Sequence, residues 1–399
     1  MNEIGGIVMG NFEEIINRTN TKSVKWDMLD TLFESNEVIP MWVADTDFKA
    51  PRQVNEALIE RAKHGVYGYT IVDNALKDAV ISWNQERHNW SIKPEWLSFS
   101  NGVVTSLHIA IQAFTEPGDN ILSQTPVYPP FYNVIKAHDR KIVKNPLKYE
   151  DEVYQIDFED FEEKLKQDVK AFILCSPHNP VGRVWKKEEL EKMARLCLKY
   201  NVLIISDEIH SDLVFPGQKH IPIASLSEEI ADQTITCMAP SKTFNLAGLD
   251  ASYVITTNEE KRTLLDMSFN KQGFNNSLNT MGNIAMEAAY TYGGEWLDEL
   301  MALMESHYQY VKTSFEAQAP ELKVVKSEGT YLLWIDCTAL DLNAKDLRAF
   351  FVGEAKVGLN AGVDYGEEAE QFMRMNIGCP RATLVEAVDR IITAVKNRK

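Results

Sequence analysis

Between about residues 97 and 255, short apolar runs alternate with longer segments of helical periodicity. The six runs are LSFS, NILSQ, KAFILCSP, NVLIISDE, TITCMAP and ASYVITT. Between two of them, residues 188–200 place Leu190, Met193 and Cys197 on one helical face. Strands that are apolar on both faces and joined by helices are typical of a largely parallel sheet covered by helices on both sides. The sequence therefore predicts an α/β fold whose ligands gather beyond the carboxyl ends of the strands.

The segments that flank this alternation predict a second, smaller unit. Residues 9–50 look irregular, residues 53–63 and 74–88 have helical periodicity, and residues 283–317 are helical again. From about residue 322, strand and helix signals mix through to a final helix, and no repeat or flexible linker divides the chain. We therefore expect a large domain over residues 50–295 and a smaller α+β domain formed by residues 1–49 together with residues 296–399.

The charge balance and the cysteine content exclude several classes of function. There are 58 Asp and Glu residues against 41 Lys and Arg, and the resulting net charge of −17 repels nucleic acids and anionic membranes. The five cysteines lack C-x-x-C or zinc-type spacing, which fits reduced thiols in the cytoplasm. The N-terminus does not resemble a secretory signal, although Met9 offers an alternative start, and no apolar run approaches about 18 residues. We expect a cytoplasmic protein without nucleic-acid or membrane partners.

Lys242 lies in the loop that follows one of the apolar runs, within TITCMAPSKTFNLAGL (residues 234–249). Lysine is rarely buried unless it is paired or modified, because an ammonium group loses strong hydration when it leaves water. A lysine at the end of a buried strand therefore either extends to water or is held there for chemistry. The residues at the neighbouring strand ends decide between these interpretations.

Four other apolar runs also end in groups that can bind a ligand. Tyr128 follows NILSQ, Asn179 follows KAFIL, Asp207 follows NVLIIS, and a helical pattern opens at residues 101–106 after LSFS. Each has an ordinary alternative: a packed loop, an Asn-Pro turn, a helix N-cap and a glycine before a helix. Together, however, they are the groups that hold a flat, phosphorylated, cationic aromatic aldehyde. The aromatic ring stacks, the helix N-terminus takes the phosphate, the carboxylate pairs with a ring N–H⁺ and the lysine forms an imine.

Several motifs occur in one recognisable combination. SPHNPVG (176–182), SDEIH (206–210), SKTFNLAGL (241–249) and FMRMNIGCPR (372–381) resemble fold-type I pyridoxal-phosphate (PLP) enzymes of the aminotransferase class I/II superfamily. PMWVADTDF (40–48), HGVYGYT (64–70) and EGTYLLWID (328–336) are similar to its MalY/PatB-like cystathionine β-lyases. The resemblance covers nearly all of residues 18–395, and it implies a PLP-dependent transferase-like fold with PLP as the cofactor.

The resemblance also implies the role of each site residue. Lys242 forms the imine with the cofactor, Asp207 pairs with the pyridine nitrogen, Asn179 binds the ring hydroxyl oxygen and Tyr128 stacks on the ring. Arg374 holds the α-carboxylate of an amino-acid substrate through two parallel hydrogen bonds.

The phosphate end of the cofactor has its own predicted ligands. The resemblance implies backbone contacts from Gly102, Val103 and Val104 and a hydroxyl contact from Ser241. Tyr69 would reach the phosphate and the active site from the neighbouring subunit, which implies a homodimer with shared active sites.

The sequence departs from the family at this phosphate end. Ala239 stands where a phosphate-binding Ser or Thr is common, three residues before the lysine. A basic ligand often follows the lysine, and only Asn245 is visible there. We therefore expect greater dependence on Ser241, the helix terminus and Tyr69.

Two histidines lie within the motifs, His178 and His210. Neither has a second ligand at a suitable spacing, so the sequence predicts no metal site. We interpret His178 as a loop residue near the cofactor and His210 as a structural residue or one behind the site.

The expected reaction is β-elimination from cystathionine or another cysteine S-conjugate, giving a thiol, pyruvate and ammonia. Lys242 would remove the Cα proton as the general base. The same residues also support an aminotransferase that acts on an amino acid and a keto acid. A third alternative is a cofactor-binding regulator without significant catalysis.

Overall fold

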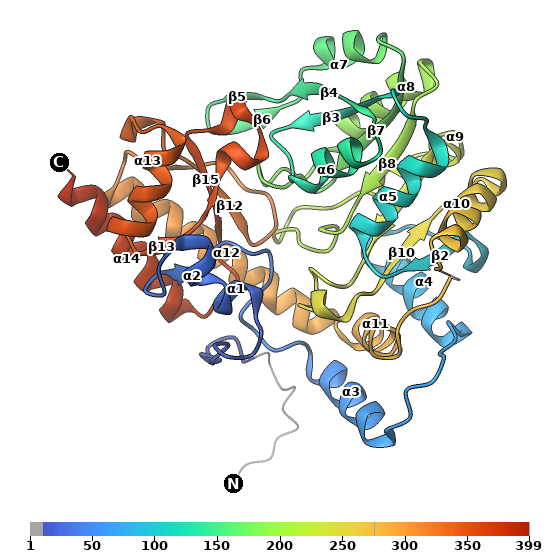
Figure 1. Ribbon diagram of the computed structural model, residues 1–399, viewed down its shortest axis with the longest axis horizontal. Helices are drawn as coiled ribbons and strands as arrows, with labels where there is room; N and C mark the ends of the chain where they lie inside the picture. The colour runs from blue at the N-terminus through green and yellow to red at the C-terminus, as the bar shows by residue number, and fades with distance from the viewer. Residues whose placement is uncertain (1–10, 275, 399) are drawn as a thin grey trace.

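A seven-stranded sheet forms the centre of the computed structural model, which describes residues 11–274 and 276–398 (Figure 1). Residues 1–10 of the predicted small domain lie outside the described residues. The strand order is β2-β10-β9-β8-β7-β3-β4, and β10 alone runs antiparallel to both of its neighbours. The strands are β2 (Leu97–Ser100), β3 (Asn120–Thr125), β4 (Lys141–Pro146), β7 (Val169–Cys175), β8 (Leu203–Asp207), β9 (Thr234–Met238) and β10 (Ser252–Ile255).

Helices cover both faces of this sheet because its strands are apolar on both sides. On β10, Val254 packs into one core cluster while Tyr253 and Ile255 pack into another, as the two-residue period of a strand requires. Helices α5 (Val103–Phe114), α6 (Pro130–Ala137) and α10 (Glu259–Lys271) lie with Val254. Other helices cover the opposite face, among them α4 (Asn74–His88), α7 (Phe158–Leu165), α8 (Lys187–Lys199), α9 (Glu228–Asp232) and α11 (Thr280–Tyr292). The predicted α/β arrangement is confirmed.

A smaller antiparallel sheet forms the second unit, with the order β11-β12-β15-β14. Its strands are β11 (Lys323–Val324), β12 (Leu332–Asp336), β14 (Asn360–Ala361) and β15 (Phe372–Asn376). The long helix α12 (Gly294–Gln318) and the final helix α14 (Arg381–Asn397) pack together beside it. Between the strands lie α13 (Ala344–Ala349) and a π-helical turn (Phe350–Glu354).

The N-terminal segment joins this second unit. Strand β1 (Ile39–Pro40) pairs in parallel with β13 (Val357–Gly358), more than 300 residues away in sequence. This pairing is consistent with the predicted combination of the two chain ends in one domain, and the boundaries at residues 50 and 295 stay predictions.

The structure corrects the sequence interpretation in places. Residues 9–50 are not irregular throughout, since they contain α1 (Val24–Asp27), α2 (Leu29–Phe33) and β1. Strand β4 (KIVKNP) was not among the predicted runs, because its lysines interrupt the apolar pattern at the sheet edge. A short hairpin, β5 (Lys148–Glu150) with β6 (Val153–Gln155), also carried no clear signal.

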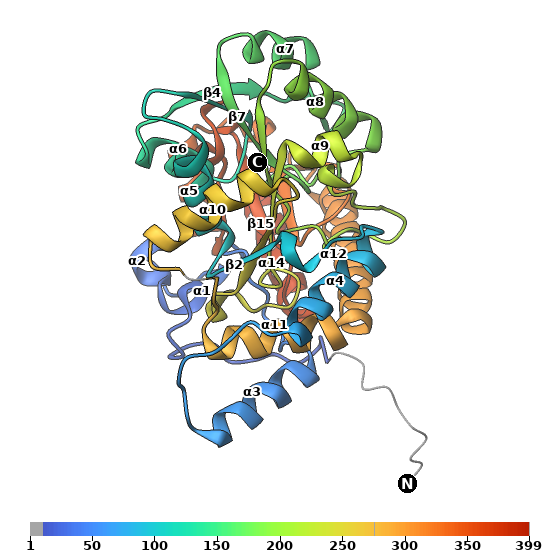
Figure 2. The ribbon, with the colours of Figure 1, turned by 90° about the vertical axis from the view of Figure 1, so that its right-hand side faces the viewer.

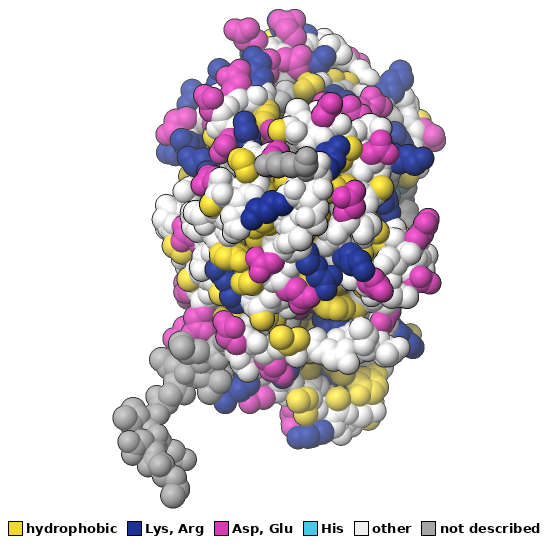
Figure 3. All heavy atoms as spheres, turned by 90° about the vertical axis from the view of Figure 1, so that its left-hand side faces the viewer, with side chains coloured by type: hydrophobic (Ala, Val, Ile, Leu, Met, Phe, Trp, Pro, Cys, Tyr) yellow, Lys and Arg dark blue, Asp and Glu magenta, His cyan; other side chains and the backbone are white. Residues whose placement is uncertain are grey.

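Helix α3 (Arg52–His64) and the segment after it project from the body of the protein (Figures 1 and 2). Over the face drawn in Figure 3, acidic and basic side chains are interspersed, so the negative net charge is not concentrated there. Within residues 11–274 and 276–398, no helix has the length and apolarity needed to cross a membrane.

A buried ion pair anchors the N-terminal segment. Lys25 is 1% exposed, and its Nζ lies 2.8 Å from Asp47 Oδ2. Arg18 also contacts Asp47, with NH1 2.7 Å from Oδ1. Removing one partner of such a pair leaves a buried charge without full compensation, which is costly.

We predict that Lys25→Ala lowers the free energy of unfolding by about 3 kcal/mol. The control is Lys49→Ala, which removes an exposed pair with Glu14 and should cost less than about 1 kcal/mol. Denaturant unfolding of both variants measures the difference, and equal effects would show that the buried pair does not anchor the segment.

Candidate active site

A cavity of about 270 Å³ opens where strands β2, β3, β7, β8 and β9 end. Strand ends of a parallel sheet meet at one edge, so residues far apart in the sequence line the same space. The cavity brings together eight of the ten predicted site residues: Gly102, Val103, Val104, Tyr128, Asn179, Asp207, Ser241 and Lys242. Tyr69 and Arg374 are not among its lining residues.

Lys242 does not extend into water. The side chain is half-buried, and Nζ donates a hydrogen bond to the Ala44 carbonyl oxygen at 2.8 Å. Burial, followed by the positive charge of Arg374, lowers the pKa of Lys242 to about 8, although the charges of Asp45 and Asp207 act in the opposite direction. The amine is therefore readily deprotonated near neutral pH, which is the form that attacks a carbonyl carbon or accepts a proton.

Asp207 ends strand β8 and is 4% exposed. No helix follows it, so the N-cap alternative is wrong. Burial raises the pKa of Asp207 to about 7, although the Ile209 backbone N–H donates to Oδ1 and Lys242 contributes positive charge. Among the described residues no cation lies within ion-pair distance of this carboxylate. A cationic ring N–H placed beside it would therefore recover much of its desolvation cost.

Asn179 and Tyr128 lie on the loops after β7 and β3. Asn179 is 3% exposed, and its Oδ1 accepts a hydrogen bond from Arg374 NH1 at 3.2 Å. Tyr128 is half-buried at the cavity wall, and burial and the negative charge of Asp207 raise the pKa of its hydroxyl. Both residues line the cavity, and Asn179 also binds Arg374. Their side chains therefore do more than stabilise the loops in which they lie.

The start of helix α5 forms one end of the cavity. Gly102 is the N-cap residue, and its backbone is followed by the first helical turn at Val103 and Val104. The N–H groups of a first turn have no helical acceptor, and the helix dipole favours an anion there. Ser241 lines the cavity too, whereas Asn245 and Ala239 do not.

Asn245 is not available to a phosphate group. Its Nδ2 donates to the carbonyls of Thr46 and Phe48, both at 2.9 Å, and its Oδ1 accepts from the Thr46 backbone N–H. The lining of the cavity includes the carboxylate residue Asp250 but no arginine, and Lys242 is its only lysine. The described residues that line the cavity therefore offer N–H and hydroxyl donors to a phosphate.

Arg374 lies on β15 and is 4% exposed. Besides Asn179, its guanidinium donates to the Trp42 carbonyl at 2.7 Å and to Asn360 Oδ1 at 2.8 Å. Its Nε has no partner among the described residues, and no carboxylate pairs with it there. A buried guanidinium held only by neutral acceptors keeps its positive charge available for a ligand carboxylate.

Residues 41–48 connect these groups, a role that no sequence pattern indicates. Their backbone carbonyls accept from Arg374 at Trp42 and from Lys242 at Ala44. Asn376 Nδ2 donates to the carbonyls of Val43 and Asp45 and holds the segment in place. Every residue type has the same backbone carbonyl, so a sequence motif does not reveal these acceptors. They could be identified only from the folded structure.

His210 is a further cavity residue, which the sequence analysis interpreted as a structural residue or one behind the site. It is 4% exposed, it lines the cavity, and its Nδ1 has no partner among the described residues. Burial, together with the positive charges of Lys242 and Arg374, lowers the pKa of His210 to about 3, so the imidazole stays neutral. The sequence signal that could have placed His210 in the cavity is its position three residues after Asp207. His178 is buried in the loop after β7 with Nε2 2.8 Å from the Pro126 carbonyl oxygen, and it does not line the cavity.

Tyr69 lies in the projecting segment after α3 and is fully exposed. Val66, Tyr67 and Ile71 beside it are also largely exposed. Tyr69 therefore takes no part in the cavity of its own chain.

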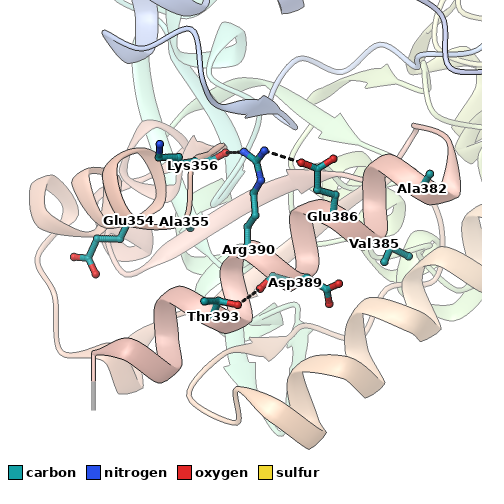
Figure 4. A pocket seen from close by; sticks show the side chains of 9 residues that line it. All are labelled: Glu354, Ala355, Lys356, Ala382, Val385, Glu386, Asp389, Arg390 and Thr393. Carbon is teal, nitrogen blue, oxygen red and sulfur yellow. Dashed lines mark hydrogen bonds and ion pairs between the residues drawn. The ribbon is translucent and has the colours of Figure 1, made fainter.

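A larger, more open hollow of about 680 Å³ lies between α14 and the turn that contains Glu354 and Lys356 (Figure 4). Its central cation, Arg390, donates to the Lys356 carbonyl and to Glu386. None of the predicted site residues lines this hollow, so the chemistry points to the smaller cavity. The described residues contain no group of three or more side chains suited to a metal ion.

Comparison with known proteins places this architecture in a family. Residues 36–391 match the aminotransferase class I and II family, and the chain belongs to it. Within that family, the chain is 47% identical to cystathionine beta-lyase PatB of Bacillus subtilis (strain 168) over 386 residues, which cover 96% of this chain and all of PatB. It is 31% identical to the protein MalY of Escherichia coli K12, with 97% and 99% of the two chains covered.

Solved structures confirm the predicted fold class. A PLP-bound putative aminotransferase from Clostridium difficile 630 superposes with a TM-score of 0.95 at 44% identity, covering 97% of this chain and all of the other. Cystalysin from Treponema denticola, whose crystal structure contains a pyridoxal 5′-phosphate cofactor, also has a TM-score of 0.95, at 38% identity with 98% and 100% covered. The predicted family resemblance is thereby confirmed as well.

The raised pKa of Asp207 predicts how the stability of the cofactor-free protein depends on pH. Because the pKa is about 7 in the folded protein and near 3.9 in the unfolded chain, ionisation above neutral pH costs the folded state up to about 4 kcal/mol. Asp207→Asn should therefore raise the melting temperature of the cofactor-free protein at pH 8, and the difference should vanish near pH 4, where Asp207 is protonated in the folded state. A pH-independent difference in melting temperature would contradict the assignment.

Proposed function

We propose that the protein is a PLP-dependent carbon–sulfur β-lyase that acts on cystathionine or another cysteine S-conjugate. The observation that carries this proposal is the placement of Lys242 and Asp207, two desolvated groups with pKa values near neutrality, in one cavity with Arg374 at its border. The names of PatB and of the cystathionine beta-lyase of Corynebacterium glutamicum, 31% identical over 391 residues, support the choice of reaction.

The residues present fit PLP. Lys242 would bond covalently to the aldehyde carbon, and Asp207 would pair with the pyridine N–H⁺. Asn179 would hydrogen-bond the ring hydroxyl oxygen and Tyr128 would stack on the ring. The free N–H groups at Gly102, Val103 and Val104 and the Ser241 hydroxyl would hold the phosphate. When bound, PLP supplies an electron-accepting ring that makes the Cα proton of an amino acid acidic.

The side chains of this protein then divide the remaining work. Arg374 fixes the α-carboxylate of the substrate by bidentate hydrogen bonds, which sets the orientation of Cα. The Lys242 amine, whose pKa in the ligand-free protein is about 8, would be released when the amino group of the substrate takes its place, and it would then remove the Cα proton as general base. The Cβ–S bond breaks, sulfur leaves as a thiolate, and the three-carbon remainder takes up water. For cystathionine and water, the products are homocysteine, pyruvate and ammonia.

An aminotransferase remains the second candidate, because the matching family and the similar Clostridium difficile protein are both named for that activity. The two reactions share every residue described above and differ in their need for a keto acid.

We also propose a homodimer whose active sites are shared between subunits. The exposed apolar side chains of Val66, Tyr67, Tyr69 and Ile71 support it, since such a cluster on a projecting segment is typical of an interface. Tyr69 would reach the phosphate end of the partner's cavity. The five cysteines are all free and buried, which supports a reducing, cytoplasmic location.

We predict that the purified protein with PLP releases pyruvate and a free thiol from cystathionine without any added keto acid. Lys242→Ala should lose turnover by at least about 10³-fold together with the visible absorption of the lysine-bound cofactor. Arg374→Ala should instead raise KM strongly, about 100-fold, and retain that absorption. Turnover that depends on a keto acid would favour the aminotransferase, and full activity in Lys242→Ala would refute the whole scheme.

The shared site predicts complementation between two inactive proteins. Tyr69→Ala and Lys242→Ala homodimers should each show little activity, because every active site carries one defect. In a mixed dimer, one site carries both defects and the other carries none, so mixing after subunit exchange should restore up to about a quarter of the wild-type activity. The absence of recovery, with exchange verified by a tag, would place Tyr69 outside the partner's site.

A further inference from the structure

A second cluster of buried ionisable side chains adjoins the loops that carry Asp207 and Lys242. It consists of two imidazole–carboxylate pairs. His88 Nε2 lies 3.0 Å from Asp212 Oδ1, and His220 Nε2 lies 2.8 Å from Glu208 Oε2. The two imidazole rings pack edge to face, with centroids 5.4 Å apart. All four residues are more than nine-tenths buried, and none lines the cavity that contains Lys242.

Each carboxylate of the cluster is connected to a residue that is predicted to hold the cofactor. Glu208 directly follows Asp207 in the chain, and it accepts hydrogen bonds from Ser206 Oγ at 2.9 Å and the Ile223 N–H at 3.2 Å. Asp212 Oδ2 accepts a hydrogen bond from Thr243 Oγ1 at 2.8 Å, and Thr243 directly follows Lys242. The cluster thus includes the residue after Asp207 and binds the side chain of the residue after Lys242.

Asp212 is the centre of this arrangement. Its Oδ1 also accepts from Trp83 Nε1 at 3.0 Å, so donors from helix α4 and from the Lys242 loop meet on one carboxylate. Burial would raise the pKa of Asp212, but the charge and hydrogen bonds from His88, Thr243 and Trp83 outweigh it and hold the pKa below its usual value. Asp212 is therefore an ionised, strong acceptor at neutral pH.

Apolar packing does not fill the space beside this carboxylate. A hollow of about 380 Å³ borders the cluster, and its lining includes Asp212, His88 and His220. Phe244, one residue further along, packs edge to face against Trp83 at a centroid distance of 5.5 Å. The Phe244 ring anchors the end of the loop, whereas at Thr243 the anchor is the hydrogen bond to Asp212.

We propose that Asp212 is a positioning residue for Lys242. By holding the Thr243 hydroxyl, it fixes the backbone at residue 243 and with it the point from which the Lys242 side chain reaches the cavity. This proposal rests on the proposed role of Lys242. Loss of the bond lets the amine sample more positions, which lowers the rate of the chemical step. It leaves substrate binding unchanged, because Arg374 comes from β15 of the other sheet.

The direct test is Thr243→Val, which removes the hydroxyl and keeps the shape. The matched control is Thr234→Val. Thr234 is equally buried, its Oγ1 donates to the Ile230 carbonyl at 2.7 Å, and it starts strand β9, at the end away from Lys242. Thr243→Ser keeps the donor and serves as the rescue variant.

In the holoenzyme with cystathionine, Thr243→Val should lower kcat about tenfold with KM within twofold of the wild type. Thr243→Ser and Thr234→Val should both stay within about threefold of wild-type kcat. Asp212→Asn, which removes the negative charge of the acceptor, should also lower kcat, as Thr243→Val does.

A second readout does not depend on turnover. When PLP is added to the cofactor-free proteins, the visible absorption of the lysine-bound cofactor should develop several-fold more slowly in Thr243→Val than in Thr234→Val. If the two valine variants are indistinguishable in both kcat and PLP uptake, the positioning role is overturned. Absence of lyase turnover in the wild type would instead overturn the proposed function, and the PLP-uptake comparison would still decide the positioning role.

Discussion

The site depends on burial without pairing. Lys242 and Asp207 are both shielded from water near the ends of the adjacent strands β9 and β8, and no direct ion pair joins them. Burial moves the pKa of each toward neutrality, downward for the amine and upward for the carboxylate. An ordinary salt bridge would have stabilised both charged forms and taken away their reactivity. The protein instead stores an unfavourable electrostatic state that a cationic, carbonyl-bearing ligand relieves.

That state needs a rigid surrounding, and distant parts of the chain provide it. The N-terminal segment supplies the Ala44 and Trp42 carbonyls, and the buried pair of Lys25 and Asp47 holds that segment in place. The second sheet supplies Arg374, and Asn376 on the same strand fastens the segment from the other side. The large sheet alone would present the strand ends, but it would lack the guanidinium and the acceptor of the Lys242 amine.

Much of the large sheet and most of its site could be predicted from the sequence, because both leave local signals. Continuous apolar runs predicted six of the seven strands, and the residues just after five of them line the cavity. The edge strand β4 was missed because exposure on its outer side permits lysines, and the reversed direction of β10 has no local signature. His210 was interpreted as a structural residue or one behind the site because histidine suits many buried positions. The acceptors at Trp42 and Ala44 are invisible to any motif, since every residue type offers the same carbonyl.

A main-chain acceptor constrains how such a site can change. The acceptor of the Lys242 amine is a main-chain oxygen, so no substitution at position 44 removes it, and alanine scanning leaves that position as it is. Mutational maps of function would score the residue as unimportant while its carbonyl stays in place. Sensitivity would instead show at the side chains that set the path of the backbone, such as Asn376 and Asp47, far from the reacting atoms in sequence.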